Sequence, residues 1–209
     1  MARARRWSAT SRLCTPTACG PPWPRTTDVA VYGFRRGVTG RIVLRVDDVE
    51  KGLLTMLLQQ LIEFVAPDGE LSDDPLAQLV GIDPDAETPQ DPALARLFPD
   101  AYRDDPEAAG EFRRFTERSL RETKVANATT ALATLQRSGE KVTLTPDEAV
   151  SWLGALTDLR LALGSRLGIT EESLDELAAL PDDDPRAATY HVYDWLTFLQ
   201  ESLVQSVMP

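Results

Sequence analysis

The chain has 209 residues, of which 43% are hydrophobic, and a chain of this length normally forms one domain with a sizeable core. Its 22 basic and 33 acidic residues give a net charge of −11, which argues against a protein that binds nucleic acid through its whole surface. The longest apolar runs are only a few residues, too short for a transmembrane helix.

The charge is divided unevenly along the chain. Residues 1–46 hold nine arginines, one acidic residue and both cysteines, whereas the remainder carries 13 basic and 32 acidic residues, a net −19. Residues 1–28 contain several prolines and show no helical or strand periodicity, so we expect a disordered basic tail. A leader translated from a start codon assigned too far upstream is the alternative. Residues 29–209 are expected to form a single domain.

That domain begins with two short β-rich runs between Val29 and Val46, separated by a turn that contains glycine. This pattern predicts a small hairpin, which should pack against helices because an isolated hairpin is marginal in water. Asp47 and Asp48 then favour a helix start, and the segment up to Val65 is apolar on two faces. We expect it to be the central, buried helix.

The later helices are marked by a capping residue followed by proline, which loses no hydrogen bond at the first helical position. Thr145 and Glu148 form the clearest such signal, a capping box. Helices are predicted near 75–81, 92–98, 106–137, 146–167, 171–180 (with Thr170 as its cap) and 185–207. Helical spacing of apolar residues predicts two core stripes, namely Trp152, Leu156, Leu159, Leu163 and Leu167, and Val192, Leu196, Leu199, Leu203 and Val207. The fold class is therefore mainly α, a helical bundle with a small N-terminal β-hairpin.

Little in the sequence indicates catalysis. His191 is the chain's one histidine, so a site with two histidine ligands is excluded, and the phosphate-binding and nucleophile-elbow motifs are absent. Acidic clusters at 73–74, 104–105 and 182–184 each adjoin a proline-started helix, and neutralisation of the helix dipole explains them better than metal binding. We assign no catalytic residue, metal site or cofactor, and predict that the protein is not an enzyme.

Two sets of charged residues still merit attention. Glu117 and Arg121 are spaced as an i,i+4 ion pair on the long helix. We interpret them as part of a solvated salt-bridge face together with Arg113, Arg114, Arg118, Glu111 and Glu122. Asp158 and Arg160 lie in a strongly apolar helix, and this suggests a partly buried pair or contact with another element. An enzyme would require both to converge with Tyr190 and His191 in one pocket.

Cys14 and Cys19 are separated by four residues within the basic tail. A reversible disulfide is easy to form in a flexible segment, and Arg12 would favour the reactive thiolate. The alternative, which the residues alone favour, is two incidental cysteines in an unstructured leader. Cys14 and Cys19 therefore stand as a possible redox pair.

From about Phe34 to Met208 the sequence resembles an actinobacterial family of uncharacterised small proteins, some of which are AosR-type oxidative-stress transcriptional regulators. The resemblance is carried by Phe34-Arg35-Arg36, Arg41-Ile42-Val43-Leu44, Leu97-Phe98-Pro99-Asp100-Ala101-Tyr102, Trp152, residues 158–164 and residues 193–201. These motifs contain no catalytic signature. From them we select Asp158, Arg160, Tyr102 and Trp195 as possible interaction or buried-pair residues.

The resemblance implies a non-enzymatic, cytoplasmic regulator in which oxidation of a cysteine pair changes contact with an alternative sigma factor of RNA polymerase. The acidic body suits a basic protein partner, and an apolar helix face suggests a homodimer. Both cysteines lie outside the region of resemblance, so such a switch would have to use the tail. The alternatives are direct DNA binding by the arginine-rich N-terminus and a structural helical domain without a regulatory role.

Overall fold

The computed structural model describes residues 33–37, 40–67, 83, 86–137, 141–181 and 183–208. The elements are β1 (Gly33–Arg36), β2 (Ile42–Arg45), α1 (Asp48–Val65), α3 (Pro92–Leu97), α4 (Pro106–Arg137), β3 (Lys141–Leu144), α5 (Pro146–Leu167), α6 (Leu174–Ala178) and α7 (Ala187–Val207). This part of the chain is mainly α, as predicted. The predicted tail at 1–28 and the predicted helix near 75–81 lie outside the described residues.

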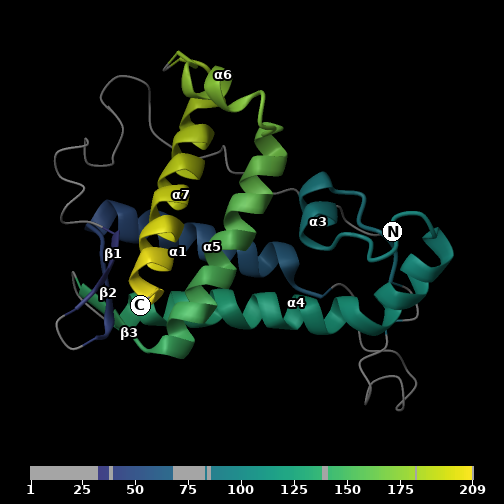
Figure 1. Ribbon diagram of the computed structural model, residues 1–209, viewed down its shortest axis with the longest axis horizontal. Helices are drawn as coiled ribbons and strands as arrows, with labels where there is room; N and C mark the ends of the chain where they lie inside the picture. Colours follow the sequence, from purple (N-terminus) through teal and green to yellow (C-terminus); the bar gives the residue numbers. More distant parts are fainter. Residues whose placement is uncertain are drawn as a thin grey trace.

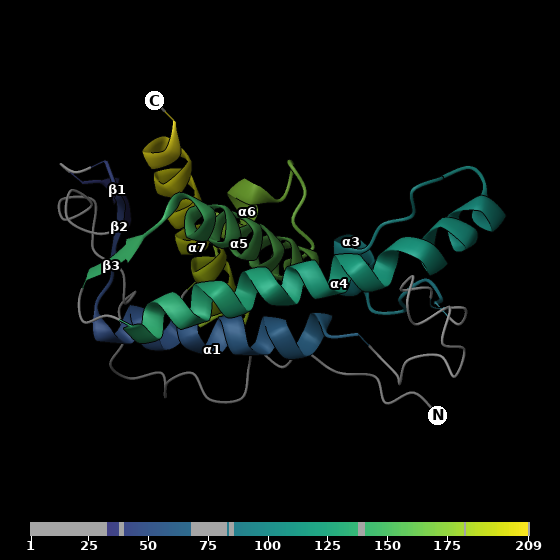
Figure 2. The ribbon, with the colours of Figure 1, turned by 90° about the horizontal axis from the view of Figure 1, so that it is seen from below.

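The long helices form two crossing pairs. Helices α1 and α4 lie side by side, and α5 and α7 form a second pair that crosses them (Figure 1). Figure 2 shows the sheet at one end of the α1–α4 pair and the first turns of α4 projecting beyond the other helices at the opposite end. None of the described helices is long and apolar enough to cross a membrane.

The predicted hairpin is confirmed, and a third strand extends it. β1 pairs antiparallel with β2, with Phe34 opposite Leu44, and β2 pairs antiparallel with β3, with Leu44 opposite Val142. In β3 the buried Val142 and Leu144 alternate with exposed residues, so one face of the sheet covers the helices. The sequence predicts only the hairpin, because the third strand lies about one hundred residues further along the chain and reaches the hairpin only in the folded protein.

The sheet packs on the bundle through Phe34 and Trp152. Their rings meet edge to face with centroids 5.5 Å apart, and the Trp152 indole N–H donates to the Thr134 hydroxyl at 2.9 Å. The two predicted stripes form much of the core except at their last members, since Leu167 is half-buried and Val207 is exposed near the ends of their helices.

Helix starts follow the predicted capping residues in most cases. Asp47 and Glu50 form a capping box on α1, and Thr145 and Glu148 form the predicted one on α5. The predicted cap of α6 is wrong: that helix begins at Leu174 after Ser173, while the Thr170 hydroxyl accepts from the Ser173 N–H in the preceding turn. Helix α7 begins at Ala187, two residues later than expected.

Candidate interaction site on helix α4

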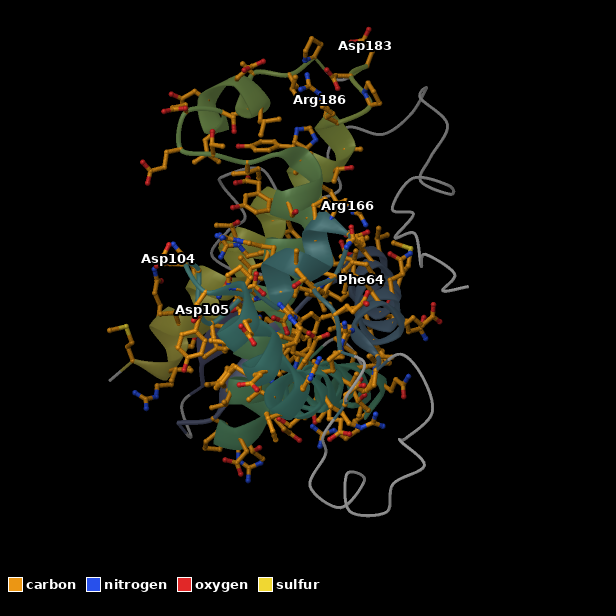
Figure 3. All side chains as sticks on the ribbon, turned by 90° about the vertical axis from the view of Figure 1, so that its right-hand side faces the viewer. Phe64, Asp104, Asp105, Arg166, Asp183 and Arg186 are labelled. Atoms are coloured by element: carbon orange, nitrogen blue, oxygen red, sulfur yellow. The ribbon has the colours of Figure 1, made fainter. Side chains whose placement is uncertain are left out.

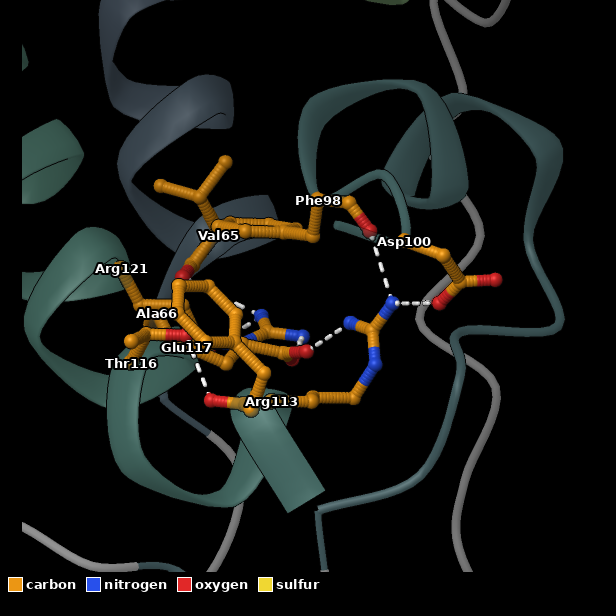
Figure 4. Close-up of polar contacts among 9 residues, drawn as sticks. Val65, Ala66, Phe98, Asp100, Arg113, Thr116, Glu117 and Arg121 are labelled. Carbon is orange, nitrogen blue, oxygen red and sulfur yellow. Dashed lines mark hydrogen bonds and ion pairs between the residues drawn. The ribbon is translucent and has the colours of Figure 1, made fainter. Parts of the chain in front are cut away.

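The inner face of the first half of α4 carries charged residues. Arg113, Glu117 and Arg121 follow one another at four-residue spacing, and each is less than a tenth exposed. The Glu117 carboxylate accepts from Arg113 through Oε2 and from the Arg121 Nε–H through Oε1 at 2.8 Å (Figure 4). The prediction of a solvated salt-bridge face is therefore wrong for these three residues, because neighbouring elements cover the side of the helix on which they lie.

Arg113 ties α4 to the chain that follows α3. Its Nη2 donates to the Phe98 carbonyl at 3.0 Å and to Asp100 Oδ1 at 2.7 Å (Figure 4). Phe98 is the C-cap of α3, where carbonyl groups lack helical partners and attract cations. Burial lowers the pKa of the Arg113 guanidinium, but the hydrogen bonds with Asp100 and Glu117 outweigh burial and leave this pKa raised.

Arg121 makes the corresponding contact with the end of α1. Its Nη1 donates to the carbonyls of Val65 and Ala66 at 3.3 and 3.4 Å. Its guanidinium also lies 4.3 Å from the centre of the Phe98 ring, a cation–π distance. The structure thus explains why the motif Leu97–Tyr102 contains Phe98, because this residue supplies a carbonyl to Arg113 and an aromatic face to Arg121.

Lys124 continues the charged face and contacts α5. Its Nζ donates to Asp158 Oδ1 at 2.5 Å, and Asp158 is almost fully buried. Burial raises the pKa of the Asp158 carboxyl, although the hydrogen bond and charge of Lys124 oppose that shift. Asp158 therefore contacts another element, one of the two outcomes expected, and it does not pair with Arg160.

Arg160 turns instead toward α7. Its guanidinium donates to the Thr197 hydroxyl at 2.9 Å and to Gln200 Oε1 at 2.6 Å, and it lies 5.4 Å from the centre of the Tyr193 ring. Gln200 in turn donates to the Thr157 hydroxyl at 2.8 Å. The two most specific motifs of the sequence, at 158–164 and 193–201, thus meet as one part-buried contact between α5 and α7.

The outer face of the same half of α4 carries exposed apolar side chains among charged ones such as Glu111 and Arg114. Four large side chains are exposed on it or beside it: Tyr102 (50%), Phe112 (46%), Phe115 (58%) and Leu120 (41%). Tyr102 and Phe112 meet edge to face with ring centroids 6.0 Å apart. A groove of about 330 Å³ runs between α4 and residues 98–101, lined by Phe98, Phe112, Leu120 and Arg113 among others. Polarity is therefore inverted here, with ions inside and aromatic rings outside.

The other predicted site residues lie elsewhere. Trp195 is buried, and its hydrogen bond lowers the pKa of the Glu50 carboxyl, while the larger effect of burial raises it. Tyr190 lies between His191 and Tyr193, with ring centroids 6.3 and 6.4 Å away. The four side chains that an enzyme would require do not converge: Arg160 contacts α7, which carries Tyr190 and His191, but Asp158 contacts Lys124 of α4 instead.

Two of the acidic clusters lie at a helix start or a neighbouring turn, whereas the cluster at 73–74, together with Asp182, lies outside the described residues. The Asp105 carboxylate accepts from the Ala108 N–H at 3.0 Å at the start of α4, and Asp184 accepts from the Arg186 N–H at 2.8 Å. Figure 3 shows Asp104 and Asp105 far from Asp183 and Arg186 on the surface. Within the described ranges, no three His, Cys, Asp or Glu side chains are placed to hold a metal ion. Cys14 and Cys19 lie outside those ranges.

Comparison with known proteins identifies relatives over most of the chain. Residues 31–207 match the family described as a domain of unknown function, DUF2017. Proteins of Mycobacterium bovis and Mycobacterium tuberculosis named "Oxidative stress regulator AosR" are each 34% identical over 223 aligned positions, which cover 92% of this chain and 98% of the relative. No solved structure gives a significant match.

Proposed function

The chain belongs to the DUF2017 family, and from this premise we propose that it is a non-enzymatic regulator of the oxidative stress response that acts by contact with another protein. The regulatory role is supported by relatives that are named oxidative stress regulators and that align with this chain over 98% of their length. We propose that it works in the cytoplasm, where a regulator of transcription meets its partners.

The main support for contact with another protein is the inverted polarity of the first half of α4, which has buried ions and exposed aromatic rings. Exposed aromatic side chains that cluster beside a groove are typical of protein interfaces, because they bury a large area at a small cost in conformational entropy. The rings of Tyr102 and Phe112 are in contact, Phe112 and Leu120 line the groove, and Phe115 is exposed one turn from Phe112. We name these four residues the outer face of α4. We propose that this face is the contact surface.

An alternative sigma factor is the partner that the resemblance implies. The net charge of −19 on residues 47–209 supports a partner with a basic surface, because opposite charges speed encounter and favour correct orientation. If the contact is controlled by a disulfide, the pair available in this chain is Cys14 and Cys19. Direct DNA binding by the arginine-rich N-terminus is the competing proposal, and it predicts an affinity that falls steeply with salt.

The regulatory role is tested by deleting the gene in its own organism and measuring transcripts before and after peroxide. The deletion should reduce the induced response, the wild-type chain should restore it, and the variant Phe115→Glu should fail to do so. Val150→Glu is the matched control, since Val150 is at least as exposed as Phe115 but lies on α5. An unchanged response in the deletion strain would overturn the regulatory role.

The sigma factor is tested separately with purified proteins. The wild-type chain and Val150→Glu should bind the factor in a sedimentation or surface-binding assay, and the oxidised chain should differ from the reduced one. Replacing both cysteines with serine should abolish that difference. Equal binding by the oxidised and the reduced wild-type chain would contradict the disulfide switch, and no binding would exclude this partner.

A further inference from the structure

We infer that the outer face of α4 docks a second copy of this chain through a two-fold, antiparallel contact between the two α4 helices. The inference rests on the proposed function, which makes this face a contact surface, and it names the occupant. Three properties of the segment support it: its local charge, the placement of its exposed charges and the sizes of its exposed side chains.

Local charge is the first property. Two copies of a chain with net charge −11 repel each other over most of their surface. Residues 103–124 carry six basic and six acidic side chains, so this stretch is neutral within a body of net charge −19. The aromatic cluster lies in the same stretch, apart from the adjacent Tyr102. A second copy can therefore approach here with the least electrostatic cost.

The arrangement of exposed charges is self-complementary. Glu111 and Arg114 are both exposed and lie one turn apart on α4. In an antiparallel pair whose two-fold axis passes between Phe112 and Arg113, Glu111 lies level with Arg114 of the second copy. The symmetry repeats this attraction on the other side of the axis. The Asp83 N–H donates to the Arg114 carbonyl at 2.9 Å, so the chain at Asp83 borders this face without burying the Arg114 side chain.

The apolar side chains fit the same register. Phe115 lies at the centre of the face turned away from the buried residues 113, 117 and 121, and Ala108 lies seven residues before it on the same side. In the proposed register, the Phe115 ring falls between Ala108 and Phe112 of the second copy, where a small residue leaves space. Figure 2 shows that this part of α4 projects beyond α1, α5 and α7, so those helices do not obstruct the approach.

The test uses paired charge reversals and measures molar mass by light scattering or sedimentation across a concentration series. The wild-type chain should associate into dimers. Glu111→Arg places arginine opposite arginine, and Arg114→Glu places glutamate opposite glutamate. The dimer dissociation constant of each variant should therefore be at least about tenfold higher than that of the wild type. An equimolar mixture of the two variants, and the double variant, should regain dimerisation because each contact again joins opposite charges.

A second variant protects the test against a folding defect. Phe115→Ser should keep the helical circular dichroism of the wild type and lose dimerisation, whereas Val150→Glu should keep both. A wild-type chain that stays monomeric at all concentrations, or charge reversals that dimerise like the wild type, would overturn the second copy as occupant. A wild-type chain that is monomeric yet restores the peroxide response in cells would overturn only the dimer. A wild-type chain that dimerises but does not restore the response would overturn only the proposed function.

Discussion

The two halves of α4 pack against the rest of the protein through different kinds of side chain. From Ala128 to Leu135 the inner face is fully buried and, apart from Thr134, apolar, as in an ordinary bundle helix. From Arg113 to Arg121 the inner face is ionic, and aromatic rings occupy the outside. Lys124, paired with Asp158, lies between the two halves. A buried ion network adds little net stability, since desolvation offsets its attraction, so the first half cannot be explained by stability alone.

The difference shows what buried charges require. Glu117 lies between two arginines, and those arginines donate further to carbonyls at the ends of α1 and α3. Each cation thus replaces lost water with carboxylate or carbonyl oxygens. The second half needs only complementary shape. The first half can therefore be disrupted by removing one charge, and the second by removing volume.

The largest effect is expected from removing the shared carboxylate. Glu117→Gln leaves Arg113 and Arg121 buried without their anion, so the free energy of unfolding should fall by roughly 3–5 kcal/mol in urea denaturation. Glu122→Gln is the control, because Glu122 is exposed and its ion pair with Arg118 is long at 3.4 Å. That control should lose less than about 0.5 kcal/mol. Equal losses in the two variants would show that the Glu117 network is not buried in solution.

A smaller loss is expected from the apolar half. Leu135→Ala opens a cavity in the core and should lower the free energy of unfolding by roughly 3 kcal/mol. Leu120→Ala removes the same atoms from the exposed outer face of the first half, and it should cost about 0.5 kcal/mol or less. Both are measured by denaturation of the monomer at low concentration. A larger cost at Leu120 than at Leu135 would contradict the inverted polarity.

The smallest effect concerns pH at the boundary between the halves. Because the folded-state pKa of Asp158 is raised, the folded chain holds this proton more tightly, and its contribution to stability falls as pH rises from the ordinary carboxyl pKa through the raised value. Asp158→Asn lacks this titration, so the variant should gain stability relative to the wild type as pH increases over that window. A relative loss would mean that attraction to Lys124 exceeds the cost of burying the carboxylate.

Local signals predicted the helices well. The acidic helix start at Asp47, the capping box at Thr145 and the prolines at helix starts depend on interactions within four residues, so the sequence alone predicts them. The predicted start of α6 was wrong, because Thr170 and Ser173 hydrogen-bond each other within a turn that precedes the helix, which begins only at Leu174. The third strand, β3, was missed because its partner β2 lies about one hundred residues earlier.

The sequence also predicts only part of the candidate site. Tyr102, Asp158 and Arg160 were selected from the motifs of the resemblance, and Asp158 and Arg160 also as charges in an apolar helix. Asp158 does contact another element. The spacing of Arg113, Glu117 and Arg121 was visible as well, but it gave the wrong environment. An i,i+4 ion pair has the same spacing on a solvated helix and on a buried one, so no local signal separates the two.

The net charge, its division between the first 46 residues and the rest, and the helical periodicity are properties of the sequence itself, and the periodicity with the capping signals determined the fold class. Only the tertiary structure decided which side of α4 is covered. The ends of α1 and α3 bring their carbonyls to the arginines, and this turns the aromatic residues outward. The physical reason is that burial depends on elements distant in the chain, whereas capping and periodicity depend on neighbours.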